Sequence, residues 1–228
     1  MRSFVMNVAT EVKRLQAFTS GYPDCLPPFE VVDCLTEDTC PPVQSWWKDG
    51  AKSWAHLHSY LKMLRLGEAS GEDFLCFEDD AIFAPDFEEV YTKAVSELPL
   101  GWDMLYLGGC HLDYEIFPPR KWPDADLLRG PVHWNTACLV NKKSVRRVIE
   151  ALEETHWPCP HVTDYKTFQL HTRQDFMTFS PLKYIVGQSE GVSTVCGRWI
   201  PEKWGNDFVY ITPDGEKVTV DLNPEGAI

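Results

Sequence analysis

Short apolar runs of strand length alternate along this sequence with segments whose apolar residues recur at helical spacing. Strands are predicted for residues 3–8, 29–33, 74–77, 103–107 and 133–140, the fourth being closed by Gly108 and Gly109. Helices are predicted for residues 10–18, 50–66, 86–98 and 143–152, the second ending near Gly67. This alternation is typical of an α/β fold with a mostly parallel central sheet flanked by helices. Residues 208–212 and 218–220, joined by a Pro-Asp-Gly turn, predict a C-terminal β-hairpin.

Length and charge limit the kinds of protein this chain can be. Its 228 residues, 44% of them hydrophobic, predict one domain over 1–228, with 197–228 as a C-terminal extension that carries the hairpin. A net charge of −13 gives no general attraction to nucleic acid or to anionic lipid, so we expect no nucleic-acid partner. No apolar run is long enough to span a membrane, and the first residues lack a signal-peptide pattern. We therefore expect a soluble, cytoplasmic protein.

The eight cysteines are scattered, with no CxxC pair and no histidine spacing typical of zinc. They are predicted to be reduced thiols. A disulfide among Cys25, Cys34 and Cys40 remains an alternative in an oxidising compartment.

Three consecutive carboxylates, Glu78, Asp79 and Asp80, follow the apolar run at residues 74–77. Ligands of open α/β sheets collect at the carboxyl ends of the strands, where this triplet is expected to lie. Neighbouring carboxylates repel one another unless a cation offsets their charge. Mg²⁺ and Mn²⁺ favour oxygen ligands and commonly join carboxylates to a diphosphate. The triplet thus predicts a site for a metal-bound diphosphate, and a solvated acidic turn is the alternative.

The segments around the triplet carry a resemblance to a known family. Residues 50–58 (GAKSWAHLH), 74–81 (FLCFEDDA) and 102–108 (WDMLYLG) follow in the order found in the family 25 glycosyltransferases, the lipopolysaccharide and collagen galactosyltransferase type. Residues 7–14, 32–33, 136–144 and 181–193 extend the resemblance over roughly residues 3 to 195. At the start of the helix in 50–58, only His58 keeps the pattern of the family.

The resemblance implies a GT-A-like nucleotide-diphospho-sugar transferase fold, an Mn²⁺ or Mg²⁺ ion, and transfer with inversion at the anomeric carbon. The resemblance does not identify the donor; a UDP- or GDP-sugar is expected as donor, and a glycan, a protein or a small molecule as acceptor. The chain would then be a metal-dependent glycosyltransferase, with a hexose as the expected sugar. By the same resemblance, Asp164 is the expected catalytic base, which takes a proton from the acceptor hydroxyl. Its alternative role is a helix N-terminal cap.

The remaining candidate residues fall into two groups. Asp80, Glu78 and His161 are the predicted metal ligands, although His161 lies between prolines and a plain loop role is its alternative. The predicted donor-binding residues are Asn7, Arg14, Asp33, Glu78, Asp79 and Gln188. Several tryptophans, Trp134 among them, are candidates to stack on a sugar ring.

Two further functions compete with transfer. The first is a catalytically inactive sugar- or nucleotide-binding module of the same fold. The second is a metal-dependent phosphoester hydrolase, which usually needs more dispersed carboxylates and histidines than this triplet supplies.

Overall fold

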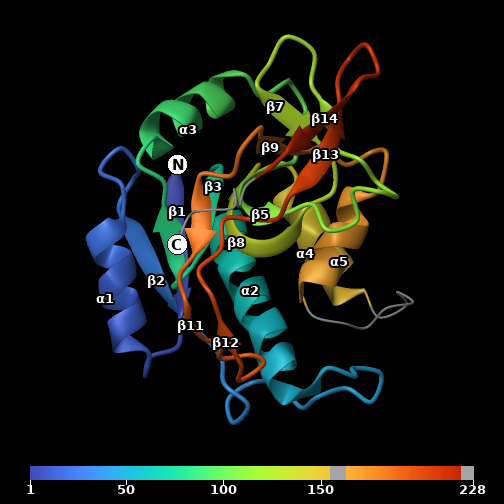
Figure 1. The fold of residues 1–228 in the computed structure, drawn as a ribbon. Coiled ribbons are helices and arrows are strands. Elements are labelled where there is room, and N and C mark those ends of the chain that lie inside the picture. Colours follow the sequence, from blue (N-terminus) through green and yellow to red (C-terminus); the bar gives the residue numbers. More distant parts are fainter. Residues whose placement is uncertain (155–162, 222–228) are drawn as a thin grey trace.

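A computed structural model describes residues 1–154 and 163–221. The five helices in these ranges alternate with strands along most of the chain (Figure 1). They are α1 (Val12–Gly21), α2 (Gly50–Ser70), α3 (Phe87–Ser96), α4 (Val145–Glu153) and α5 (Thr163–His171). The chain therefore has the α/β organisation that the sequence predicts.

A ten-stranded sheet forms the centre of the molecule, in the order β14-β13-β6-β7-β9-β5-β8-β3-β1-β2. Its strands are β1 (Arg2–Asn7), β2 (Phe29–Asp33), β3 (Phe74–Glu78), β5 (Met104–Cys110), β6 (Arg120–Lys121), β7 (Leu127–Arg129), β8 (His133–Val140), β9 (Thr178–Pro181), β13 (Phe208–Ile211) and β14 (Lys217–Val220). Two small antiparallel pairs lie beside it: β4 (Ala81–Phe83) with β10 (Val186–Gln188), and β11 (Gly191–Val192) with β12 (Trp199–Ile200).

The central sheet is mixed, so the prediction of a mostly parallel sheet is wrong. β1 pairs in parallel with β2 and β3, and β5 with β9, but β8 is antiparallel to both of its neighbours, β3 and β5. Parallel neighbours need a crossover, usually a helix, whereas antiparallel neighbours do not. No helix lies between β5 and β8 in the described chain, and β8 accordingly returns beside β5 in the opposite direction.

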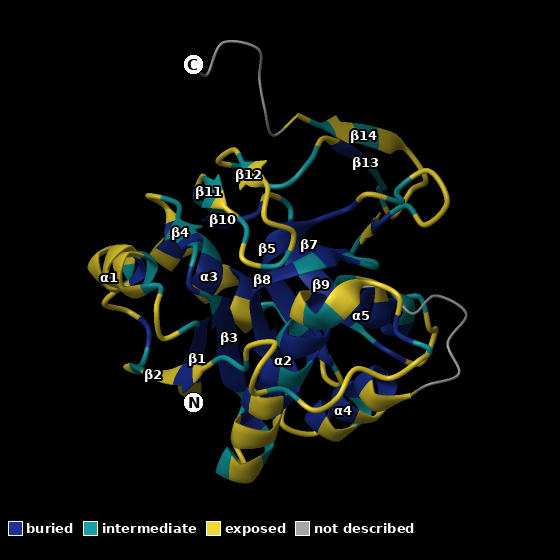
Figure 2. Ribbon diagram, turned by 90° about the horizontal axis from the view of Figure 1, so that it is seen from below, coloured by how far each residue is buried: buried dark blue, intermediate teal, exposed yellow. Residues whose placement is uncertain are grey.

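Helices cover both faces of the sheet, which gives three layers. The alternating side chains Phe4 and Met6 of β1 join the apolar face of α2 and α4 in one core, and Val5 joins α1 and α3 in the other. Figure 2 shows buried strands between helices whose outer faces are exposed. The period-two alternation of the strands thus divides the apolar residues between two cores.

Two elements continue past the glycines that were predicted to end them. β5 runs through Gly108 and Gly109 to Cys110. Gly108 leaves room for the backbone of Val186, because an added Cβ on Gly108 would lie 2.5 Å from the carbonyl oxygen of Val186. α2 runs through Gly67 to Ser70. Gly67 leaves room for the ring of Phe74, which an added Cβ would overlap. These glycines serve close packing and not termination.

The predicted hairpin is present as β13 and β14, which pair antiparallel. β13 joins the main sheet through a parallel bridge of Ile211 to Arg120. Phe208 is 1% exposed and packs on His111, so the hairpin is anchored in the core. No described helix is long and apolar enough to cross a membrane. The seven cysteines in the described ranges are free thiols, in agreement with the prediction.

Candidate functional site

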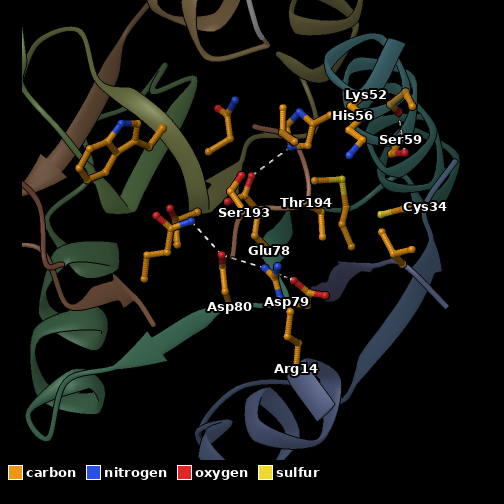
Figure 3. Close-up of a pocket in the computed structure, with 18 of the residues that line it drawn as sticks. Arg14, Cys34, Lys52, His56, Ser59, Glu78, Asp79, Asp80, Ser193 and Thr194 are labelled. Carbon is orange, nitrogen blue, oxygen red and sulfur yellow. Dashed lines mark hydrogen bonds and ion pairs between the residues drawn. The ribbon is translucent and has the colours of Figure 1, made fainter. Parts of the chain in front are cut away.

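A pocket with a volume of about 420 Å³ opens beyond the carboxyl ends of β1 and β3 (Figure 3). Small-molecule sites in proteins commonly have volumes of about 300–1,000 Å³. Among the candidates, Arg14, Glu78, Asp79, Asp80, Asp164 and Gln188 line the pocket. The structure therefore brings together most of the residues singled out from the sequence.

Asp79 is fixed by two neighbours. Arg14, in the first turns of α1, places Nη2 2.6 Å from Asp79 Oδ1, and Asn7 Nδ2 donates to Asp79 Oδ2 at 2.6 Å. Asp79 is 8% exposed. Both of its oxygens have partners within the protein, so its charge supports the fold of the β3–β4 turn.

Asp80 keeps one oxygen without a partner. Its Oδ2 forms an ion pair with Arg14 Nη2 at 2.8 Å and accepts a hydrogen bond from Gln188 Nε2 at 2.8 Å. Its Oδ1 is buried and accepts no hydrogen bond from the described residues. A buried acceptor of this kind calls for a cation or a donor from outside the described chain.

Glu78 faces the pocket from the end of β3 and is linked to α5 through His56. His56 Nε2 lies 3.2 Å from Glu78 Oε1, and His56 Nδ1 lies 2.9 Å from Thr163 Oγ1. Burial lowers the pKa of His56, but its hydrogen bond and charge interaction with Glu78 raise it overall above the ordinary value. The imidazole thereby connects the acidic triplet with the start of α5, which carries Asp164.

Asp164 lies in the first turn of α5 and not before it, so the alternative role as N-cap does not describe its place. Asn135 Nδ2 donates to Asp164 Oδ1 at 2.7 Å. An anionic side chain in the first turn of a helix is favoured by the helix dipole. Asp164 is partly buried and lines the same pocket as Glu78 and Asp80.

Three carboxyl groups of the pocket hold protons more tightly than usual. Burial raises the pKa of Asp79 against the opposing charge of Arg14 and the hydrogen bond from Asn7. Burial, and then repulsion from Glu78, raise the pKa of Asp80 to about 6, against the opposing charge of Arg14. Burial and the charge of Glu78 also raise the pKa of Asp164 to about 6, against the opposing charge of His56. At Asp80 and Asp164 the repulsion from Glu78 is larger than the attraction to the neighbouring Arg14 or His56, so these cations do not fully offset the charge of Glu78.

The donor set fits a hard divalent cation held jointly by protein and ligand. Asp80 Oδ1 needs a partner, and Glu78 brings a second carboxylate to the same pocket. The described residues contain no group of three or more His, Cys, Asp or Glu side chains that could hold a metal alone. Mg²⁺ sites commonly use one or two carboxylates together with phosphates and water, which matches this set.

The other predicted site residues are placed differently. Asn7 is buried behind Asp79 and reaches the pocket only through it. Asp33 ends β2 beside Asn7 but is exposed and does not line the pocket; its carbonyl oxygen accepts from Lys62. His161 lies outside the described residues. His58, which keeps the family pattern, packs against Trp54 and is not part of the pocket lining.

The sequence alone did not point to several residues of the pocket. His56, Asn135 and Lys203 are such residues. Trp134, a candidate for stacking on a sugar, also lines the pocket, and the ammonium of Lys203 lies 3.6 Å from the centre of its ring. His56 lies one helical turn after Lys52, which lines the same pocket, but the place of both residues at the pocket follows only from the packing of α2. Trp134 has a φ of 65°, a left-handed conformation that nothing in the local sequence announces.

Comparison with known proteins gives a distant likeness. No protein-family profile and no curated protein matches the sequence. The fold is similar to that of A197 from STIV, with a TM-score of 0.40 and 11% identity over 89% of this chain and 95% of that one. It is also similar to a glycosyltransferase involved in the glycosylation of the major capsid of PBCV-1, with a TM-score of 0.38 and 10% identity over 78% and 82% of the two chains. Likeness at this level assigns neither family nor activity, and membership of family 25 is not confirmed.

Proposed function

We propose that this protein is a metal-dependent glycosyltransferase with a GT-A-like fold, which moves a sugar from a nucleotide-diphosphate donor to an acceptor hydroxyl with inversion. The resemblance of its segments to family 25 supports the fold and the donor class. The observation that carries the proposal is that one pocket contains both the unpartnered oxygen of Asp80 and the carboxyl group of Asp164.

The donor side is formed by the acidic triplet. Asp80 and Glu78 would hold Mn²⁺ or Mg²⁺, which when bound neutralises the departing nucleoside diphosphate. Arg14 keeps Asp79 and Asp80 in place, and Gln188, at the end of β10, orients Asp80. Lys52, exposed at the start of α2, lines the pocket and offers a further positive charge to phosphate.

The acceptor side is formed by Asp164. A general base works best when its pKa is near the working pH, and the pKa of Asp164 is raised to about 6. Its carboxylate would take the proton of the acceptor hydroxyl as that oxygen attacks the anomeric carbon. Attack on the face opposite the leaving group inverts the configuration.

An inactive nucleotide- or sugar-binding module is the second candidate, and Arg14 is the observation that favours it. Because Arg14 pairs with Asp79 and Asp80, the triplet is partly neutralised without a metal. The residual charge around Glu78 and the raised pKa of Asp164 favour the enzyme.

Metal and nucleotide binding can be measured by thermal unfolding with Mn²⁺ and either UDP or GDP. A ligand at one hundred times its dissociation constant adds about 2.7 kcal/mol to stability. We expect stabilisation by one nucleotide only with the metal present, and its loss in Asp80→Asn. Asp24→Asn, at an exposed position, is the matched control and should bind as the wild type does. Equal stabilisation of Asp80→Asn and the wild type would refute the metal assignment.

Transfer itself is tested with Asp164→Asn. Donor binding should remain, while turnover falls by a factor of about 10²–10⁴, the usual contribution of a general base. Release of nucleoside diphosphate from a panel of UDP- and GDP-sugars, with water as the acceptor, measures turnover, and proton NMR gives the anomeric configuration of the sugar when it is first released. Donor binding without turnover of any donor in the wild type would favour the inactive module.

A further inference from the structure

A buried chain of hydrogen bonds lies behind Asp164. The hydroxyl of Tyr106, on β5, donates to Asn135 Oδ1 at 3.0 Å, and Asn135 Nδ2 donates to Asp164 Oδ1 at 2.7 Å. Tyr106 and Asn135, the latter on β8, are 0% and 1% exposed. These hydrogen bonds therefore link the core to the pocket directly through side chains.

The hydroxyl of Tyr106 fixes the orientation of the Asn135 amide. An asparagine side chain has one accepting oxygen and one donating nitrogen, and either can face a given neighbour. With Tyr106 donating to the oxygen, the nitrogen must face Asp164. Thr167 Oγ1, 3.3 Å from Asn135 Oδ1, has a nearer acceptor in the carbonyl oxygen of Asp164 at 2.9 Å. The Tyr106 hydroxyl also lies 3.4 Å from His171 Nε2, but its contact with Asn135 Oδ1 is shorter, at 3.0 Å. Tyr106 is thus the main donor to the amide oxygen.

The same arrangement distinguishes the two oxygens of Asp164. Within the described chain, the hydrogen bond to its side chain reaches Oδ1. Donation to the charged form favours the ionised carboxylate, and it holds one oxygen against β8. The other oxygen is left to meet a ligand in the pocket.

We propose that Asn135 and Tyr106 are positioning residues for Asp164, with Tyr106 setting the amide of Asn135 so that Asp164 presents Oδ2 to the acceptor hydroxyl. This inference rests on the proposed function, in which Asp164 is the base. It assigns a role to a buried tyrosine that touches neither ligand.

Other charges also act on Asp164 and must stay constant in the test. Glu78 of β3 raises its pKa, whereas His56 of α2 and Lys203 lower it. The test variants therefore change only uncharged side chains. Tyr106→Phe removes one hydroxyl, and Asn135→Ala removes the amide.

Tyr60→Phe is the matched control, because Tyr60 is also 0% exposed and belongs to the same core as Tyr106. The hydroxyl of Tyr60 contacts Cys138 Sγ at 3.6 Å, whereas that of Tyr106 contacts Asn135. Loss of this hydroxyl disturbs the core without touching the chain to Asp164.

Two measurements are made on each variant. The carboxyl ¹³C signal of Asp164 is titrated in metal-free protein, and the rate of donor turnover is followed against pH. We expect Asn135→Ala to raise the midpoint of the Asp164 titration by about one pH unit and to shift the acid limb of the rate profile by the same amount. Below the midpoint, the rate is then roughly ten-fold lower than in the wild type. Tyr106→Phe should lower that rate about five-fold, as for loss of one hydrogen bond. Tyr60→Phe should change neither.

Unchanged titration of Asp164 in Asn135→Ala and Tyr106→Phe would overturn the inference and leave the proposed function intact. An equal shift in Tyr60→Phe would also overturn it, because the effect would then be a general loosening of the core. If the titration shifts as expected while Asp164→Asn retains full turnover, the proposed function fails and the positioning of Asp164 stands.

Discussion

Asp80 and Asp164 lie in surroundings that favour the protonated carboxyl group, with pKa values of about 6 for both. In the unfolded chain an aspartate has a pKa near 4. The folded protein therefore binds more protons than the unfolded chain between about pH 4 and pH 6, and its free energy of unfolding falls as the pH rises through that window. Above the window, both groups are charged and their contribution is unfavourable.

Replacing Asp164 by Asn removes one of these charges and keeps an oxygen that can accept from Asn135. We expect Asp164→Asn to raise the free energy of unfolding at pH 8 by ~1–3 kcal/mol and to give no gain near pH 4. Urea denaturation at the two pH values measures this. The exposed Asp24→Asn serves as control, and an equal gain at both pH values would show that charge is not the cause.

The acidic triplet could be predicted as a continuous motif, and the candidates Arg14, Asp164 and Gln188 from more distant segments also line the pocket, but other pocket residues were missed. Glu78, Asp79 and Asp80 are adjacent and follow an apolar run, so their common place at a strand end could be predicted. His56 and Asn135 reach the same pocket from α2 and β8, and only tertiary packing brings them there. Asp33 also lies at a strand end, but its side chain is exposed and does not line the pocket. Position at a strand end alone therefore does not place a residue in this site.

Among the elements, α2 shows how packing overrides a local signal. A glycine near the end of a helical pattern usually predicts its C-terminus, and Gly71, with a φ of 68°, does cap α2. Gly67 lies inside the helix, and a glycine is needed there because the ring of Phe74 occupies the space that a side chain would fill. The sequence cannot separate these two glycines, since the difference lies in β3.

Gly67→Ala should therefore destabilise the protein even though alanine favours helices. Overpacking of a core costs ~1–3 kcal/mol, which exceeds the gain of up to ~1 kcal/mol from helix propensity. Gly21→Ala, at the end of α1 with open space around it, is the matched control and should be neutral or slightly stabilising. Chemical denaturation compares the two, and equal effects would show that the ring of Phe74 yields at no cost.

The positions of most helices and long strands could be predicted, but the direction of the strands could not. Apolar periodicity is a property of each segment, and it identified β2 and β8 with their observed bounds. Direction depends on how the chain crosses between strands. The short strands β4, β6, β7 and β9 to β12 were missed for a related reason, because runs of two to four residues carry too little periodicity.

Across the whole molecule, the C-terminal segment takes part in both the core and the pocket. Ile200 and Lys203 line the pocket, and the backbone groups of Gln188 and Lys203 exchange hydrogen bonds of 2.8 and 3.0 Å. Gln188 in turn contacts Asp80. Residues that were predicted to form an extension therefore contribute to the site in the described structure.

Phe208→Ala should destabilise the entire protein by ~3–5 kcal/mol, the usual cost of removing a buried phenylalanine side chain. We also expect weaker nucleotide binding, because β13 anchors the segment that carries Lys203. Thr219→Ala, exposed on β14, is the control. Thermal unfolding with and without Mn²⁺ and nucleotide gives both quantities, and wild-type stability of Phe208→Ala would show that the hairpin is an independent appendage.

The reversed direction of β8 has a consequence for how such a pocket can change. Because β8 runs against β3, its first residues, Trp134 to Thr136, lie at the edge where β3 ends. The long connection from β5 enters the molecule directly before them. Insertions or exchanges in that connection can reshape one half of the pocket while the turn that holds Asp79 and Asp80 stays as it is. In the proposed glycosyltransferase, preference for the acceptor could thus change, in evolution or in engineering, while recognition of the donor stays the same.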